Sequence, residues 1–161
     1  MPRSREHAYD VTVTWTGNTG EGTAGYRAYT RDHDVTAPDK ATRLTGSADP
    51  AFVGDPERWN PEELLVASLS QCHMLSYLAV CSLKKVVVTA YEDVARGAMS
   101  ETAGGGGRFT EVVLNPVVTV AEESMVEAAT ALHEDAHRIC FIANSVNFPV
   151  RHAPRIVVAG G

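Results

Sequence analysis

The stretch RWNPEELLVASLSQCHMLSYL, residues 58–78, decides the fold, because it begins a helix and then continues without charge. Asn60 suits the helix cap and Pro61 the first turn, and Glu63 completes a capping box three residues after the cap. Residues 64–83 are 20 positions without a charged side chain, although six of them are polar. The pattern predicts a long buried central helix more strongly than a membrane span of the same length.

A helix that is apolar on all sides must be covered on all sides. The chain has 161 residues, which is enough for one domain with a core, so a single domain over residues 1–161 is expected. One small domain covers such a helix poorly, whereas two copies could wrap their central helices together. The sequence therefore favours a homodimer.

The segment before this helix predicts strands and a long connection. Residues 10–15 alternate as DVTVTW, and residues 25–32 read GYRAYTRD after a glycine-rich turn, which is typical of a hairpin. Residues 35–59 are rich in Pro, Asp, Gly and Ser and predict a long connection with a short strand near residues 41–44. Loops of that length often carry function.

The segment after the helix predicts a second hairpin, a second helix and a closing strand. Residues 85–100 and 108–120 are rich in Val, Thr and Tyr and flank AGGGG at residues 103–107. A strand rather than a helix follows the glycines, which favours a hairpin tip over a phosphate-binding loop. Residues 122–142 have helical periodicity and residues 156–159 form a strand. The fold class expected from these elements is α+β.

Three cysteines, an odd number, do not suit a secreted disulfide framework, so reduced thiols are expected. Cys72 and Cys81 are nine residues apart in the central helix, which places them on opposite faces. Cys81 is expected to be a small core residue. Cys72 lies among small residues, but it is far beyond the first helical turn, so a cation from elsewhere would be needed to activate it.

Cys140 lies near the carboxyl end of the second predicted helix, on its apolar side. The helix dipole there disfavours a thiolate, which suits a resolving thiol better than an attacking one. Two helices that each present one cysteine to a shared interior would allow a two-cysteine redox cycle. From the residues alone, two buried structural cysteines are the better interpretation.

The letters HEDAHRIC, residues 133–140, contain the zinc-protease pattern His133-Glu134-x-x-His137. At helical spacing the two histidines share a face, as zinc ligands would. A third ligand is missing, since His152 is the only later histidine and lies past Pro149 in an extended segment without a matching signature. The pattern is therefore interpreted as solvated helix surface, and no metal is expected.

Composition excludes several partners. The formal charge of −6, from 14 Lys plus Arg against 20 Asp plus Glu, would repel a phosphate backbone. Residues 1–10 are polar and carry no secretory signal, so a cytoplasmic location is expected. Neither nucleic acid nor a membrane is an expected partner.

RWNPEELLVASLSQCHMLSYL, followed much later by AHRICFIANSVNFPV, resembles the OsmC/Ohr family of thiol-dependent peroxidases, and YRAYTRDHDV is similar to its OsmC-like branch. The resemblance covers nearly the whole chain. It implies an α+β, OsmC-like fold in which two long helices pack against curved antiparallel sheets. It also implies an intertwined homodimer with two active sites at the interface.

By position, the resemblance makes Cys72 the peroxidatic cysteine, Cys140 the resolving cysteine and Glu62 the carboxylate that orients an activating arginine. The arginine would hold the Cys72 thiolate and donate hydrogen bonds to the peroxide. Its position differs between branches of the family. The candidates are Arg27, which we favour, then Arg43, and also Arg31 and Arg58.

The activity implied by the resemblance is reduction of organic hydroperoxides to alcohols, within the oxidative stress response. Cys72 becomes a sulfenic acid, the Cys72–Cys140 disulfide follows, and an external dithiol, such as a lipoylated protein, restores the thiols. No cofactor is implied. His73 stands where better-known members often have Phe, which leaves the preferred hydroperoxide open. The alternative is a redox-sensing or small-ligand-binding protein on the same scaffold.

Overall fold

The computed structural model describes residues 4–160, which fold as two compact units. One unit is Met1–Leu64 and the other is Leu65–Gly161. The prediction of a single domain is not decided by this division and stays a prediction.

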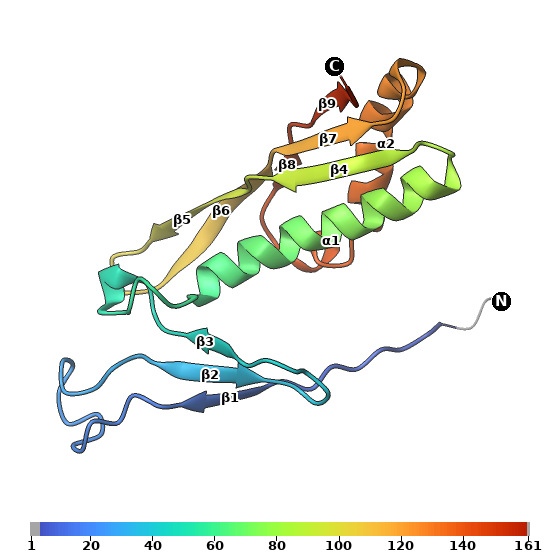
Figure 1. Cartoon of the computed structure of the whole chain (residues 1–161). Coiled ribbons are helices and arrows are strands. Elements are labelled where there is room, and N and C mark those ends of the chain that lie inside the picture. Colours follow the sequence, from blue (N-terminus) through green and yellow to red (C-terminus); the bar gives the residue numbers. More distant parts are fainter. Residues whose placement is uncertain (1–3, 161) are drawn as a thin grey trace. The chain divides into compact units, whose positions relative to one another are not determined.

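The first unit carries a three-stranded antiparallel sheet in the order β1-β2-β3. The strands are β1 (Thr12–Trp15), β2 (His33–Thr36) and β3 (Leu44–Gly46) (Figure 1). The first strand was predicted correctly. The predicted strand over residues 25–32 is wrong, because the partner of β1 begins only at His33.

Residues 16–32 form a loop whose local bonds replace the expected ladder. The Asn18 side-chain oxygen accepts hydrogen bonds of 3.0 Å from the N–H groups of Gly20 and Gly22, and both glycines have positive φ. Gly17 approaches Thr30 so closely that a Cβ would lie 1.9 Å from the Thr30 carbonyl oxygen. The chain therefore turns several times before it returns to the sheet.

The predicted capping box at the start of α1 (Pro61–Leu83) is confirmed. The Glu63 N–H donates to Oδ1 of Asn60 over 2.8 Å, and the Asn60 N–H donates to Oε2 of Glu63 over 3.1 Å. A short 3₁₀ helix, η1 (Pro50–Phe52), lies in the connection before it. The two reciprocal bonds satisfy amide groups that a helix terminus otherwise leaves open.

The helix α1 buries one narrow stripe of side chains at intervals of four residues. These are Leu69, His73, Tyr77 and Cys81. By length and composition the helix could also cross a membrane, a test that core helices of globular proteins pass as well. Leu75 is 61% exposed and Leu83 is 79% exposed. A single chain therefore leaves apolar surface of α1 open.

The second unit contains two three-stranded sheets, in the orders β4-β7-β9 and β5-β6-β8. The central pairs are antiparallel, but β8 and β9 join in parallel, so the sheets are mixed rather than purely antiparallel as expected. The strands are β4 (Val88–Asp93), β5 (Arg96–Glu101), β6 (Gly107–Leu114), β7 (Pro116–Val120), β8 (Val150–His152) and β9 (Arg155–Val158). The glycine-rich segment connects β5 to β6 as a hairpin, which confirms that prediction.

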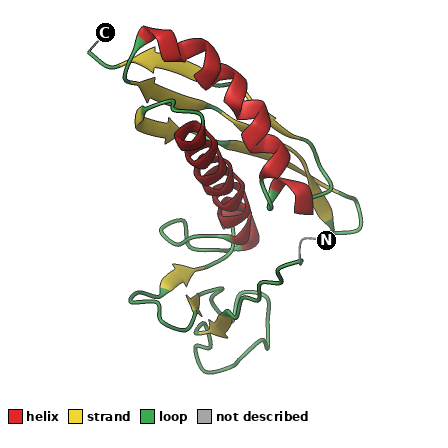
Figure 2. Cartoon of the chain, turned by 90° about the vertical axis from the view of Figure 1, so that its right-hand side faces the viewer, coloured by secondary structure: helices red, strands yellow, loops and turns green. Residues whose placement is uncertain are grey.

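The second predicted helix is present but shorter than expected. It begins with a 3₁₀ turn, η2 (Glu123–Met125), and continues as α2 (Val126–Ile139), and a further 3₁₀ turn, η3 (Ala143–Ser145), follows. Cys140 leaves the helical conformation at φ −70° and ψ 110°. The two helices are separate coils beside the strands (Figure 2).

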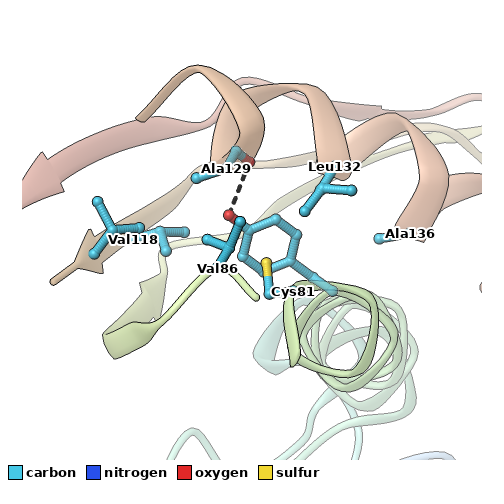
Figure 3. Packing of buried hydrophobic residues seen from close by; sticks show 8 residues of the cluster. Cys81, Val86, Val118, Ala129, Leu132 and Ala136 are labelled. Atoms are coloured by element: carbon cyan, nitrogen blue, oxygen red, sulfur yellow. Dashed lines mark hydrogen bonds between the residues drawn. The ribbon is translucent and has the colours of Figure 1, made fainter. Parts of the chain in front are cut away.

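Two clusters of buried side chains form the core of the second unit. The larger cluster joins Tyr77 and Cys81 of α1 to α2 and β7, and Figure 3 shows Cys81, Val118 and Leu132 converging in it. The predicted role of Cys81 as a core residue is confirmed, since it is 1% exposed. The smaller cluster joins Leu69 to the strand β6. Both clusters use the buried stripe of α1.

The larger cluster also contains hydrogen-bonded polar groups. The Tyr77 hydroxyl donates to the Ala129 carbonyl oxygen over 2.8 Å (Figure 3). Four residues before Tyr77 on the same stripe, His73 contacts α2. Its Nε2 and Nδ1 of His133 are 3.0 Å apart in a buried hydrogen bond. His133 is fully buried, so its interpretation as solvated helix surface is wrong. Its side of α2 faces α1 instead of water.

We expect Asn60→Ala to destabilise the protein by about 1 kcal/mol, because it removes the side-chain acceptor of the capping box. The measurement is urea unfolding of wild type and variant under identical conditions. Asn60→Asp is the matched control, since it keeps an acceptor at the cap and should stay within about 0.5 kcal/mol of wild type. Equal stability of all three proteins would contradict this account of the cap.

We also expect stability to fall in acid because His73 and His133 are buried as neutral rings. Burial, followed by the neighbouring histidines, lowers the pKa of His73 to about 4 and that of His133 to about 3. The unfolded chain binds protons below its ordinary pKa of about 6.5, while the folded chain does not. Stability is therefore complete above that pH and is lost as the pH falls from there toward 4.

The loss should be on the order of 6 kcal/mol between pH 7 and pH 4, about half from each histidine and beyond any contribution from carboxylates. Urea unfolding across this range measures it. The double variant His73→Gln/His133→Asn keeps hydrogen-bonding groups at the two sites but does not titrate there, so its stability should depend less on pH. The same pH dependence in both proteins would show that these histidines are not responsible.

Candidate active site

Cys72 and Cys140 are neighbours in the second unit, as the sequence led us to expect. Cys72 is partly exposed in the middle of α1, and Cys140 is 1% exposed at the end of α2. Burial, and next the adjoining Cys72 thiol, raise the pKa of Cys140 to about 11. Cys140 is therefore a protonated thiol at neutral pH, and the more accessible Cys72 is the thiol that a solute can reach.

The third thiol has different surroundings. Cys81 lies in the larger core cluster beside Tyr77, and burial raises its pKa. It is nine residues after Cys72 in the same helix, and the two thiols face different sides. Cys81 thus belongs to the packing, while Cys72 and Cys140 form a pair.

Three contacts join α1 to α2 and to Cys140, the residue just after α2. The two segments run antiparallel, so residues earlier in α1 contact residues later in the second segment. Tyr77 contacts Ala129, His73 contacts His133, and Cys72 contacts Cys140. We call these three contacts the α1–α2 ladder. The thiol pair is the last contact of this ladder, next to the histidine pair in the chain.

The four candidate arginines lie in the first unit and have different partners. Arg43 pairs with Asp34 at 3.3 Å. Arg58 lies 3.7 Å from Asp32 and 3.6 Å from Asp55. Arg27, the arginine favoured from the sequence, is exposed.

Arg31 is held by carbonyl oxygens and aromatic rings. Its guanidinium group donates to the carbonyl oxygens of Tyr29 over 2.8 Å and Tyr26 over 2.6 Å. The same group lies 4.0 Å from the ring centroid of Tyr29 and 4.5 Å from that of Tyr26. These contacts fix the planar guanidinium without neutralising it by a carboxylate in contact.

Arg31 and Glu62 line one pocket of about 330 Å³ in the first unit. Aromatic rings of Trp15, Tyr29 and Phe52 form part of its wall. The pocket is lined by Trp15, Tyr29, Arg31, His33, Ser47, Ala48, Asp49, Phe52, Pro61 and Glu62. An aromatic wall with one arginine and two carboxylates, Asp49 and Glu62, suits a small organic molecule with a polar, electron-rich group. Of the four arginines, Arg31 is the one that shares this pocket with Glu62.

The residues that match the zinc-protease pattern do not form a metalloprotease site. His133 bonds to His73 in the core, whereas Glu134 is exposed and its carboxylate lies 3.4 Å from Nε2 of His152. Within residues 4–160, no group of three or more His, Cys, Asp or Glu side chains is arranged to hold a metal ion.

The histidines around the ladder were the feature that sequence reasoning missed. His152 lies in β8 and its ring centroid is 5.5 Å from that of His73 and 6.0 Å from that of His133. The strand is brought there by parallel pairing with β6, which no local sequence pattern indicates. The only available signal was that His73, His133 and His137 occur on the two helices that carry the thiols.

Solved structures with similar folds include several OsmC and organic hydroperoxide resistance proteins. An OsmC-like protein of unknown function from Vibrio cholerae is 32% identical, with a TM-score of 0.81 over 92% of this chain and 99% of that chain. An organic hydroperoxide resistance protein from Elizabethkingia anophelis is 18% identical, with a TM-score of 0.70 over 97% and 99%.

An organic hydroperoxide resistance protein from Legionella pneumophila is 17% identical, with a TM-score of 0.69 over 96% of this chain and 100% of that chain. At these two lower identities the likeness establishes the fold alone. Among curated proteins, no sequence matches this chain. The sequence profile described as OsmC-like protein matches residues 54–154, which include α1, α2 and both thiols of the pair. The chain belongs to the OsmC-like protein family.

Proposed function

We propose that this protein is a thiol-dependent peroxidase that reduces organic hydroperoxides. The observation that carries the proposal is the pairing of an accessible thiol, Cys72, with a buried protonated thiol, Cys140, in an OsmC-like fold. Relatives of the same fold that are named organic hydroperoxide resistance proteins support the choice of substrate class.

In the first step the Cys72 thiolate attacks the outer oxygen of the hydroperoxide and the O–O bond breaks. Sulfur gains a hydroxyl group as sulfenic acid, and the departing alkoxide takes a proton to become the alcohol. In the second step Cys140 condenses with the sulfenic acid, forming the disulfide and releasing water. An external dithiol then returns two electrons and two protons to the thiols.

The cation required to activate Cys72 is assigned in this proposal to Arg31 rather than to Arg27. Arg31 already has its guanidinium plane fixed by two tyrosine rings and two carbonyl oxygens. Glu62 lines the same pocket and would orient the remaining donors toward the peroxide. The aromatic wall of this pocket would hold the organic part of the substrate. The assignment of Arg27 stays an untested alternative.

The complete site requires a second copy of the chain in this proposal. Glu62 precedes Cys72 by ten residues of one helix, which is about 15 Å along the axis and too far for a shared ligand atom. A homodimer could bring the pocket of one copy to the thiol pair of the other. The open apolar surface of α1, including Leu75, supports such an interface because it lacks cover in one chain.

The reductant is proposed to be an external dithiol, for which a lipoylated protein is one source. A cytoplasmic location is proposed with it, because a reducing compartment would keep the three thiols available. The chemistry described above needs no bound cofactor.

We expect Cys72→Ser to abolish turnover of cumene hydroperoxide in the presence of excess dithiothreitol, because the attacking sulfur is missing. Cys140→Ser should react with about one equivalent quickly and then turn over slowly, since its sulfenic acid lacks the neighbouring thiol. Peroxide consumption per mole of protein measures both effects.

Cys81→Ala is the matched control and should retain turnover, because Cys81 is separate from the pair. Wild type that consumes only one equivalent would refute the peroxidase. That result would favour redox sensing, in which the thiols switch state once instead of cycling.

We expect Arg31→Lys to lower kcat/KM for cumene hydroperoxide by about 10- to 100-fold, because lysine lacks the planar fork that fixes two hydrogen bonds. Arg27→Lys is the matched control and should remain within about twofold of wild type. Steady-state kinetics of the two variants distinguish the two assignments. A loss with Arg27→Lys and none with Arg31→Lys would reverse them.

Mixing inactive variants tests whether the site is shared between two copies. Cys72→Ser and Arg31→Ala homodimers should each be inactive, but mixed dimers would contain one intact site made from both chains. With free exchange of subunits, activity should recover to about a quarter of the wild-type value. Recovery that fails although mixed dimers are detected would show that Cys72 and Arg31 act within one chain.

A further inference from the structure

Four of the six histidines of this chain gather between α1, α2 and β8. The His73 ring centroid is 5.3 Å from that of His133 and 5.5 Å from that of His152. The His137 centroid is 5.6 Å from that of His152. We call these four residues the histidine cluster: His73, His133, His137 and His152. It adjoins the thiol pair in sequence on both helices.

The histidine cluster is poorly suited to a purely structural core. In the part of the chain that the structure describes, Nε2 of His133 and Nδ1 of His152 are buried without a hydrogen-bond partner. Each such group costs about 1–3 kcal/mol relative to a satisfied one. Apolar side chains of similar volume would fill this space without that cost. The histidines therefore need another reason to be there.

The α1–α2 ladder supplies a geometric reason. His73 is the residue after Cys72, so a movement of the His73 backbone also moves the attacking thiol. His133 is seven residues before Cys140, or about 10 Å along α2. The histidine contact and the thiol contact are thus adjacent on α1 but seven residues apart on the side of α2. A disulfide requires Cβ atoms about 3.5–4.5 Å apart, so a small tilt of either helix affects its formation.

We propose that the His73–His133 hydrogen bond positions Cys72 against Cys140 and sets how readily the two thiols form a disulfide. Both histidines are positioning residues in this proposal, because they act through the helices and not on the substrate. The inference concerns the second step of the proposed peroxidase cycle. The thiol pair itself, and therefore the test below, does not depend on peroxide reduction.

The hydrogen bond requires neutral rings, because one ring must donate through its N–H group while the other accepts through a lone pair. If both rings are protonated, two N–H groups face each other across 3.0 Å. The ionisable groups around the pair are His137 and Glu134 of α2, His152 of β8 and Tyr77 of α1. His137 and His152 are further basic groups that oppose a charge on the pair. Acid therefore opens this contact only where both rings are protonated, which the lowered pKa of His73, about 4, and that of His133, about 3, place well below neutral pH.

Two variants separate positioning from simple packing. His73→Phe keeps a ring in the core but removes the hydrogen bond. The double variant His73→Gln/His133→Asn places amide groups near the positions of Nε2 and Nδ1, and these amides bond without titrating. His137→Gln is the matched control, since it changes a histidine of the cluster outside the bond. All variants carry Cys81→Ala so that only one thiol pair is present.

The measurement is the equilibrium between the Cys72–Cys140 dithiol and oxidised dithiothreitol. Two electrons and two protons pass from the protein thiols to the reagent, which gives the protein disulfide and reduced dithiothreitol. The ratio of oxidised to reduced protein reports the effective concentration of one thiol at the other. Circular dichroism of each reduced variant establishes that it is folded before the comparison.

We expect His73→Phe to lower this equilibrium constant about 10-fold or more at pH 7. The double variant and His137→Gln should stay within about threefold of wild type. If the histidines contribute only to packing, His73→Phe should lose stability while this equilibrium constant stays unchanged.

An unchanged constant in folded His73→Phe would overturn the proposal, as would a double variant whose constant falls as far as that of His73→Phe. If His73→Phe does not fold, His133→Phe takes its place, because it removes the same hydrogen bond from the α2 side. Failure of peroxide turnover with a normal disulfide equilibrium would refute the proposed peroxidase and leave the positioning role intact. The two proposals therefore fail by different measurements.

Discussion

The structure depends on the burial of α1, a helix with 20 consecutive uncharged residues. Its stripe of Leu69, His73, Tyr77 and Cys81 supplies side chains to both core clusters of the second unit. Sheets, α2 and the loop after α2 all pack against this stripe. The helix thereby brings distant parts of the sequence to one place, including the two thiols 68 residues apart.

Apolar burial supplies most of the driving force, but it does not fix where one helix lies along another. Directional contacts do so here, through the Tyr77 bond to Ala129 and the His73 bond to His133. A hydrogen bond has a narrow range of length and angle, so it specifies the position of one helix along the other, which apolar contacts do not. The thiol pair benefits from this precision because sulfur–sulfur bonding tolerates little displacement.

Local patterns predicted the elements whose cause is local. The cap of α1 follows from Asn60, Pro61 and Glu63, and the β5–β6 hairpin follows from its glycines. Predictions were wrong where distant contacts decide. The alternation at residues 25–32 is that of a strand, yet the loop closes on itself through bonds such as Trp15 Nε1 to the Thr30 oxygen. The prediction that His133 lies on the surface is wrong because the sequence of residues 133–140 does not show that α1 covers this side of α2.

The sequence by itself determined the α+β class and the long central helix, because periodicity and capping are properties of short segments. The roles of Cys72 and Cys140 rest on the family resemblance and not on a local pattern. Only the tertiary structure decided that Arg31 shares a pocket with Glu62, that β8 joins its sheet in parallel, and that four histidines gather beside the thiols. These features arise from contacts between segments far apart in the chain. The packing of the whole core decides which segments meet, and short sequence patterns do not specify it.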